Sequence, residues 1–289
     1  MSYEYYIGVM DEESVLVECG PMRLVIRAWK MGRPQIEVAR QAAEKSIIYL
    51  EQIASCRPLL SRAVPEIVSW PEADLAVQMI TSVKAIGDGD LTPMAAVAGT
   101  MADAVADWLV AQKMDRVIVD NGGDIALRLK AGQTARVGIR PRIDSRLVSH
   151  VLNIDASQPA WGVTTSGLGG RSLTRGIASA VTVLASNASV ADAAATAIGN
   201  ACFVEDDGII QLPADSLDPN TDLAGMLVTA KVGELLPEKI FQAIESARQK
   251  AERLSQRKII RGAFIALQNV FAISDGLKPY ISPVSETGD

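Results

Sequence analysis

The stretch VDNGGDIALRL, residues 119–129, places two glycines and two aspartates inside a run of strand-forming aliphatic residues. Alternating apolar residues predict half-buried strands. Glycine weakens a strand, so a pair of glycines indicates a tight turn or a ligand that approaches the backbone closely. In the first interpretation, Asn121, Gly122, Gly123 and Asp124 form a hairpin turn that joins RVIVD to IALRL. In the second, the same four residues contribute to a binding site, and the stretch alone leaves both interpretations open.

The segments around this hairpin predict a mixture of helices and strands. Helical spacing of apolar residues predicts helices over 34–54, 72–86, 93–113, from about 189 to 203, and over 237–258. Strands are expected before residue 30, at TARVGIR, SHVLNI, WGVTTSG and ASAVTVLA, and in a final pair after 258. Residues 204–235 are polar and irregular and predict a loop with a short helix. Because the elements lack a strict βαβ rhythm, the expected class is α+β with mixed or antiparallel sheets flanked by helices.

Composition limits the classes of partner. The chain has 289 residues, 48% of them hydrophobic, and a net charge of −6. No dense Lys/Arg face is visible, which argues against a nucleic-acid partner. The N-terminus is polar, and no apolar run is expected to reach the roughly 18 residues of a membrane span. Cys19, Cys56 and Cys202 form no CxxC pair, so we expect free thiols and a cytoplasmic protein.

A second candidate segment is GVTTSGLGGRSLTRG, residues 162–176, which combines hydroxyls, glycines and two arginines. Backbone N–H groups in a glycine-rich turn can bind anionic oxygens, and Arg171 and Arg175 could neutralise one phosphate. The spacing matches neither a Walker A loop nor a dinucleotide-binding fingerprint. A glycine-rich hairpin without a ligand is the alternative.

A third candidate is the alanine-rich segment SNASVADAAATAIGNA, residues 186–201. Asp192 and Thr196 are one helical turn apart, so a carboxylate and a hydroxyl share one face and could bind Mg²⁺ through hard oxygens. The alternative is a capping box formed by Ser189 and Asp192 at the start of the helix. The single histidine, His150, is expected to be a strand residue with one satisfied hydrogen bond.

In this order, NGGD, TTSG and ADAAAT resemble the ApbE family of FAD:protein FMN transferases. AAVAGTMADAVADWLVAQKMDRVIVDNGGD, residues 95–124, and VGIRP, residues 137–141, extend the resemblance over roughly residues 90–203. The resemblance implies one ApbE-like domain over 1–289. It implies that Asp192 and Thr196 bind a metal with a backbone carbonyl near Ala96, that Asn121, Gly122, Gly123 and Asp124 face the nucleotide, and that Thr165, Ser166 and Gly167 lie beside the flavin or its phosphates.

The chain departs from that family at two places. The transferases carry a lysine in the helix where this chain has Gly99 or Thr100, and a histidine between the second and third segments where this chain has none. The chain is thus identified as a divergent ApbE-like branch, and no catalytic residue is assigned.

Three functions follow from this resemblance. The leading hypothesis is a Mg²⁺-dependent site for FAD or a related nucleotide or flavin-like phosphate ligand, in which Arg171 and Arg175 replace the lysine. The rivals are an accessory or sensor protein without catalytic activity in anaerobic sulfur assimilation and homocysteine formation, and an authentic FMN transferase. The expected partner is a small nucleotide-like molecule, and a homo-oligomer stays open.

Overall fold

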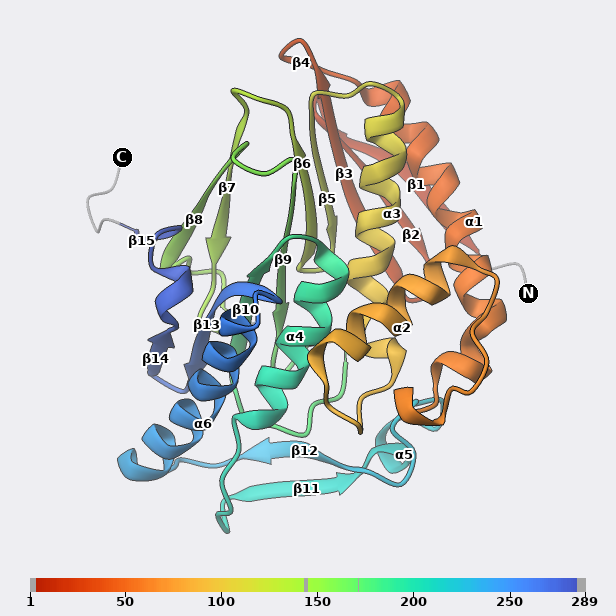
Figure 1. Ribbon diagram of the computed structural model, residues 1–289. Coiled ribbons are helices and arrows are strands. Elements are labelled where there is room, and N and C mark those ends of the chain that lie inside the picture. The colour runs from red at the N-terminus through yellow and green to blue at the C-terminus, as the bar shows by residue number, and fades with distance from the viewer. Residues whose placement is uncertain (1–3, 143–144, 171, 285–289) are drawn as a thin grey trace. The chain divides into compact units, whose positions relative to one another are not determined.

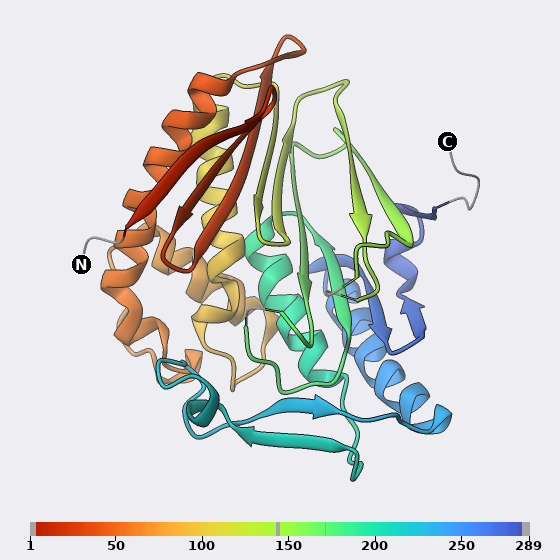
Figure 2. The same cartoon turned by 180° about the vertical axis from the view of Figure 1, so that it is seen from behind.

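The computed structural model describes residues 4–142, 145–170 and 172–284 (Figures 1 and 2). Contacts between residues divide them into two compact units. The first unit comprises the described residues up to Ala135, then Asp155–Thr164 and Ala185–Ala193. The second comprises Arg136–Ile154, Thr165–Leu184 and the described residues from Ala194 onward.

The first unit is built on a large antiparallel sheet with the strand order β1-β2-β3-β5-β6-β9. Its strands are β1 (Tyr5–Asp11), β2 (Ser14–Cys19), β3 (Met22–Lys30), β5 (Arg116–Asn121), β6 (Asp124–Leu129) and β9 (Ala160–Ser166). The short β4 (Arg33–Pro34) pairs with β3. Alternation along β5 and β3 buries Val117, Val119, Leu24 and Ile26, which form the core beneath the helices.

Helices cover one face of this sheet (Figure 1). α1 (Ile36–Leu60) and α3 (Val97–Ala111) contact the strands and each other, and α2 (Asp74–Ile86) packs against both. The 3-10 turns η1 (Val64–Glu66) and η2 (Pro93–Ala96) lead into α2 and α3 respectively. α4 (Ala188–Ala201) begins in this unit, and its residues from Ala194 belong to the second. Small side chains in α3 and α4 permit close approach of backbones.

The second unit contains three groups of strands. β10 (Ala180–Ala185), β13 (Ile260–Leu267) and β14 (Val270–Ile273) are neighbours in that order, and α6 (Pro237–Gln256) packs on β13. β7 (Thr134–Ile139), β8 (His150–Asp155) and β15 (Ile281–Pro283) form a separate small sheet. β11 (Ile209–Pro213) and β12 (Leu227–Val232) pair antiparallel, with α5 (Ala214–Leu217) between them and η3 (Asp275–Leu277) after β14.

The α+β class and the antiparallel sheet flanked by helices are confirmed. Residues 204–235 correct one expectation, because β11 and β12 form a hairpin there in addition to the short α5. The segment Pro93–Ala111 corrects another, since it is long and apolar enough to cross a membrane by composition, although 56% of its apolar 18-residue window is buried inside the fold. That burial is typical of a core helix. The three cysteines are free thiols, and the single domain expected over 1–289 stays a prediction.

Candidate functional site

The hairpin turn between β5 and β6 is present as the first interpretation predicts. β5 ends at Asn121 and β6 begins at Asp124, which leaves Gly122 and Gly123 as a two-residue loop. Their φ angles are 68° and 110°, a combination that glycine adopts readily and that suits a tight hairpin. The Gly123 amide donates to Asp120 Oδ1 at 2.8 Å. A Cβ on Gly123 would meet nothing within 4 Å, so open space adjoins the turn.

Asn121 ties this turn to the beginning of α3. Its side chain is 4% exposed, and its Nδ2 donates to the carbonyl of Ala98 at 3.2 Å. Its Oδ1 accepts from the backbone N–H of Arg23 at 3.4 Å. The side chain therefore fixes the turn against the first residues of α3 and against β3. Its expected role toward a nucleotide stays a prediction.

Asp192, from the first half of α4, reaches the same place. Its Oδ2 accepts the amide of Gly99 at 2.9 Å, and the amide of Ala98 also donates to this carboxylate. These are first-turn amides of α3, which lack partners within their own helix. A carboxylate there is stabilised by both hydrogen bonding and the helix dipole. Asp192 thus caps α3 from a neighbouring helix.

The capping box proposed for Ser189 and Asp192 is therefore wrong. Asn187, the residue before α4, accepts the amide of Val190 at 2.9 Å through Oδ1 and so caps α4. The Ser189 hydroxyl donates to the same Oδ1 at 3.1 Å. Ser189 already lies inside the helix, where its hydroxyl cannot reach the amide three residues on in the manner of a capping residue.

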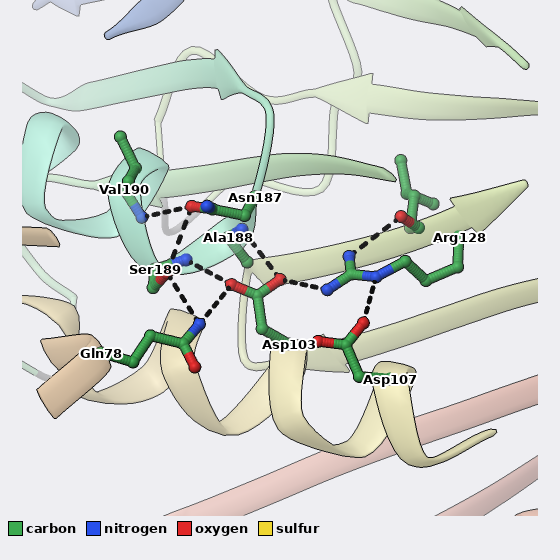
Figure 3. Close-up of polar contacts among 9 residues, drawn as sticks. Gln78, Asp103, Asp107, Arg128, Asn187, Ala188, Ser189 and Val190 are labelled. Carbon is green, nitrogen blue, oxygen red and sulfur yellow. Dashed lines mark hydrogen bonds and ion pairs between the residues drawn. The ribbon is translucent and has the colours of Figure 1, made fainter. Parts of the chain in front are cut away.

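Asp103 makes the matching contact in the opposite direction (Figure 3). Its side chain is 1% exposed, and its oxygens accept the amides of Ala188 at 3.1 Å and Ser189 at 2.8 Å. Arg128 Nη2 donates to Asp103 Oδ1 at 2.9 Å, and Arg128 Nε donates to Asp107 Oδ1 at 2.6 Å. No motif in the sequence predicted this network. Its signal was the pair Asp103 and Asp107 inside the apolar segment MADAVADWL, together with Arg128 inside the apolar segment IALRL.

The electrostatics of Asp192 show a shortage of positive charge. Burial raises the pKa of the Asp192 carboxyl to about 7, the amides of Gly99 and Ala98 work against the rise, and the negative charge of Asp103 adds to it. A cation beside the carboxylate would lower this pKa. Within the network, Arg128 already serves two carboxylates, Asp103 and Asp107. The half-buried Asp192 is therefore suited to hold a cation or a proton.

Asp124 and Thr164 lie opposite each other on neighbouring strands. Their Cα atoms are register partners between β6 and β9, so both side chains point to one face of the sheet. Arg128, two pleats along β6, points to α3 from that face. Thr164 is fully buried, and its hydroxyl has no hydrogen-bond partner in the part of the chain that the structure describes. This leaves an unsatisfied polar group next to Asp124.

The remaining candidate residues divide between the units. Ala96 is buried at the end of η2, and Thr196 lies half-buried on α4, one turn beyond Asp192. Thr165 Oγ1 lies 2.9 Å from Thr182 Oγ1 in the second unit. The other residues expected to lie beside the flavin or its phosphates also belong to the second unit, namely Ser166, Gly167 and Arg175. Arg171 lies outside the described residues.

Two of these residues have structural roles of their own. A Cβ on Gly167 would lie 2.7 Å from the carbonyl oxygen of Ser179, so packing alone requires glycine. Arg175 donates its amide to Asn200 Oδ1 at 3.2 Å.

The structure thus joins two of the three sequence segments directly. The NGGD turn and Asp192 both bond the backbone of Ala98 and Gly99 at the start of α3. Thr164, the first residue of TTSG, pairs with Asp124. Among the described residues, no group of three or more His, Cys, Asp or Glu side chains could hold a metal. A cation at Asp192 would depend on hydroxyl and carbonyl oxygens for its other ligands.

The fold is that of the ApbE proteins. Over 96% of both chains, the structure is similar to the apo form of the flavinyl transferase ApbE from Pseudomonas stutzeri, with a TM-score of 0.50 and 15% identity. It is also similar to the flavin transferase ApbE from Vibrio cholerae, with a TM-score of 0.53 and 12% identity over 96% of this chain and 99% of that chain. At these identities the likeness shows the fold alone.

Sequence relatives carry the description UPF0280 protein. The relative from Methanococcus vannielii is 30% identical over 71% of this chain and 85% of its own length. One from Archaeoglobus fulgidus is 41% identical over 43% of this chain and 48% of its length, and one from Methanococcus maripaludis is 37% identical over 39% and 46%. The chain thus spans about half the length of several relatives that it matches. A family model described as AbpE bacteria matches residues 8–275, and the chain therefore belongs to that family.

Proposed function

We propose that this chain binds a nucleotide or flavin-like phosphate ligand together with Mg²⁺ where the Asn121–Asp124 turn meets the start of α3. One observation carries the proposal. Asn121 and Asp192, 71 positions apart, bond the backbone of the adjacent residues Ala98 and Gly99, at 3.2 and 2.9 Å. Two ligand-type segments from different elements therefore meet at one helix start, beside the open space at Gly123.

The donor set at this point fits Mg²⁺. Asp192 supplies a half-buried carboxylate whose pKa is raised by burial, Thr196 supplies a hydroxyl one turn along α4, and the carbonyl of Ala96 is the proposed third ligand. All are hard oxygen donors of the kind that Mg²⁺ prefers. When bound, Mg²⁺ would neutralise phosphate oxygens and orient the ligand. Asp192 would hold the ion while its contact with the Gly99 amide keeps the carboxylate in place.

The phosphate side of the site is assigned to backbone and small polar groups. Gly122 and Gly123 have the positive φ angles that favour glycine, and their lack of a side chain lets a ligand approach the backbone. Asp124 adjoins the unpartnered hydroxyl of Thr164, a group that a ligand or a water would satisfy. Ser166, Gly167 and Arg175, which are expected to contact a phosphate, belong to the second unit, and their role toward the ligand stays a prediction.

The proposal stops at binding and does not include FMN transfer. The chain contains one histidine, His150, whose Nδ1 lies 2.9 Å from Ser149 Oγ and whose ring packs beside Phe264 and Phe271. Burial lowers the pKa of this imidazole. His150 therefore has a structural role in the second unit, and no histidine occupies the position where the transferases carry theirs.

Calorimetry tests the proposal directly. FAD, FMN and ATP are titrated into the purified chain with and without MgCl₂. We expect at least one of them to bind only when Mg²⁺ is present. Asp192→Asn should weaken that binding by about tenfold or more, because the charge that a hard cation requires is removed. Thr196→Val should weaken it as well, since it keeps the β-branched shape but loses the oxygen.

Asp74→Asn is the matched control. Asp74 is an exposed carboxylate in the first turn of α2, so this change removes the same charge without touching α3 or α4. Its binding should equal that of the wild type. Binding that does not depend on Mg²⁺, or that survives both Asp192→Asn and Thr196→Val, would contradict the metal assignment. Failure of all three nucleotides to bind would favour an accessory protein without catalytic activity that keeps the fold as a scaffold.

A further inference from the structure

The first turns of α3 and α4 are each bonded by a carboxylate of the other helix. Gly99 on α3 donates its amide to Asp192 on α4 at 2.9 Å. Ala188 and Ser189 on α4 donate their amides to Asp103 on α3 at 3.1 and 2.8 Å. On each helix the donating amide precedes the carboxylate by one turn. We call these five residues, Gly99, Asp103, Ala188, Ser189 and Asp192, the α3–α4 clamp.

The two helices touch within the clamp. A Cβ on Gly99 would lie 2.2 Å from the carbonyl oxygen of Ala188 and 2.9 Å from Asp192 Cβ. At this separation the position of one helix start determines that of the other, because packed backbones cannot slide without clashes. The contacts of Asp103 with α4 therefore also set the place of Asp192.

Arg128 makes it feasible for Asp103 to remain charged. Asp103 is 1% exposed, and a buried carboxylate without a partner is strongly unfavourable. Arg128 Nη2 meets Asp103 Oδ1 at 2.9 Å, and Arg128 is itself anchored by Asp107 at 2.6 Å (Figure 3). Gln78 Nε2 adds contacts with Asp103 Oδ2 at 3.4 Å and with Ser189 Oγ at 3.1 Å. The carboxylate is thus held from β6, α2 and α4 at once.

We infer that Asp103 is a positioning residue, which holds the first turn of α4 so that Asp192 stays on the amides of α3 and faces the ligand site. The inference rests on the proposed function, since a ligand site at Asp192 gives the positioning its purpose. Asp103 itself touches neither metal nor ligand in this assignment. It acts through α4, in the manner of outer residues that orient a metal ligand.

The test compares Asp103→Asn with Asp107→Asn. The Asp103→Asn change keeps the size of the side chain. It removes the negative charge that pairs with Arg128, and it also removes one of the two oxygens that accept the amides of α4. Asp107 bonds Arg128 but, among the described residues, makes no hydrogen bond to α4, and its side chain is 63% exposed. Two quantities are measured on each variant. The first is the hydrogen-exchange rate of the Gly99 amide by NMR. The second is the affinity for Mg²⁺, measured by titrating MgCl₂ in the presence of whichever of FAD, FMN and ATP binds the wild type best.

In Asp103→Asn we expect exchange at Gly99 to accelerate by about tenfold, while the amide of Val119 in the core of β5 keeps its rate. We expect the Mg²⁺ affinity to fall by about 10- to 100-fold, the usual range for an outer residue. Asp107→Asn should leave both quantities near the wild-type values. A purely structural role would lower the melting temperature and accelerate exchange at Gly99 and Val119 together.

Unchanged exchange at Gly99 in a folded Asp103→Asn protein would overturn the inference, as would an unchanged Mg²⁺ affinity. If Asp103→Asn does not fold, Gln78→Leu replaces it, because Gln78 contacts both Asp103 and Ser189 and carries no charge. The same local acceleration at Gly99 is then expected, and its absence contradicts the inference. If the wild type binds no Mg²⁺, the proposed function fails, while exchange at Gly99 still decides whether Asp103 positions Asp192.

Discussion

Replacement of Gly99 by alanine tests the close approach of α3 to α4 in the first unit. An alanine Cβ would lie 2.2 Å from the Ala188 carbonyl oxygen and 2.9 Å from Asp192 Cβ, so one of the helices must move. In an unobstructed helix the same change favours folding by about 1 kcal/mol. Here overpacking opposes it by about 1–3 kcal/mol, and displacement of the bond from the Gly99 amide to Asp192 opposes it by a further 1.5–3 kcal/mol or so. The balance predicts a net loss of about 2–4 kcal/mol in the free energy of unfolding.

Gly199→Ala supplies the control within the neighbouring helix. Gly199 lies in α4, and a Cβ there would meet nothing within 4 Å. We expect this variant to match the wild type or to gain up to about 1 kcal/mol. Urea denaturation followed by circular dichroism gives both values, provided that the slope of the transition does not change. If Gly99→Ala proves as stable as Gly199→Ala, the close packing of α3 and α4 is refuted, together with the clamp.

Three further predictions concern the same region. Burial raises the pKa of Asp192 from its ordinary 3.8 to about 7, so the folded state binds a proton that the unfolded state releases, and wild-type stability falls as pH rises through this window. At about pH 8 without Mg²⁺, Asp192→Asn should therefore melt at a higher temperature than the wild type, and its free energy of unfolding should be larger by at most about 4 kcal/mol, less with solvent screening. At about pH 4 the two proteins should melt at the same temperature; equal melting at both pH values would contradict this. Asn121→Ala should cost about 1–3 kcal/mol in urea denaturation because the two side-chain bonds from Asn121, to the Ala98 carbonyl and from the Arg23 amide, are lost; a neutral effect would show that the turn is not anchored there. Incubation with FAD, Mg²⁺ and a threonine-containing acceptor peptide should give no fluorescent flavinylated product at a useful rate, because general acid–base assistance worth about 10²–10⁴-fold is missing; efficient labelling would restore the transferase hypothesis.

Local patterns in the sequence predicted most of the elements around the site. NGGD between alternating apolar residues gave the β5–β6 hairpin, and apolar spacing gave α1, α2, α3 and α4. α1 nevertheless runs to Leu60 instead of residue 54 and contains Pro58. A proline disfavours continuation of a helix, but Leu60 is fully buried at its end. Tertiary burial there outweighs local preference, which a single sequence does not reveal.

The contacts of the site were harder to predict, because they join residues far apart in the sequence. Asp192 was correctly placed on the helix face with Thr196, but its carboxylate bonds α3 instead of its own helix. Asp103 and Arg128 stood out only as charges inside apolar segments, and nothing local indicated that they would pair. The strands β11 and β12 were missed for a related reason, since a long polar connection separates them and no short turn signals a hairpin.

The packing of α3 on α4 leaves no room for a lysine at Gly99 or Thr100, the place where the resemblance implies the lysine of the transferases. The two residues at that place are Gly99, where even a Cβ would clash with Ala188, and Thr100, which is fully buried with an unpartnered hydroxyl. A lysine at either residue would force α3 and α4 apart or bury an ammonium group without a partner. The start of α3 is already neutralised by Asp192, a negative charge that adds to those of an anionic ligand instead of balancing them. In the proposed site, a metal ion beside Asp192 would supply the positive charge, and for this reason we expect nucleotide binding to depend steeply on Mg²⁺.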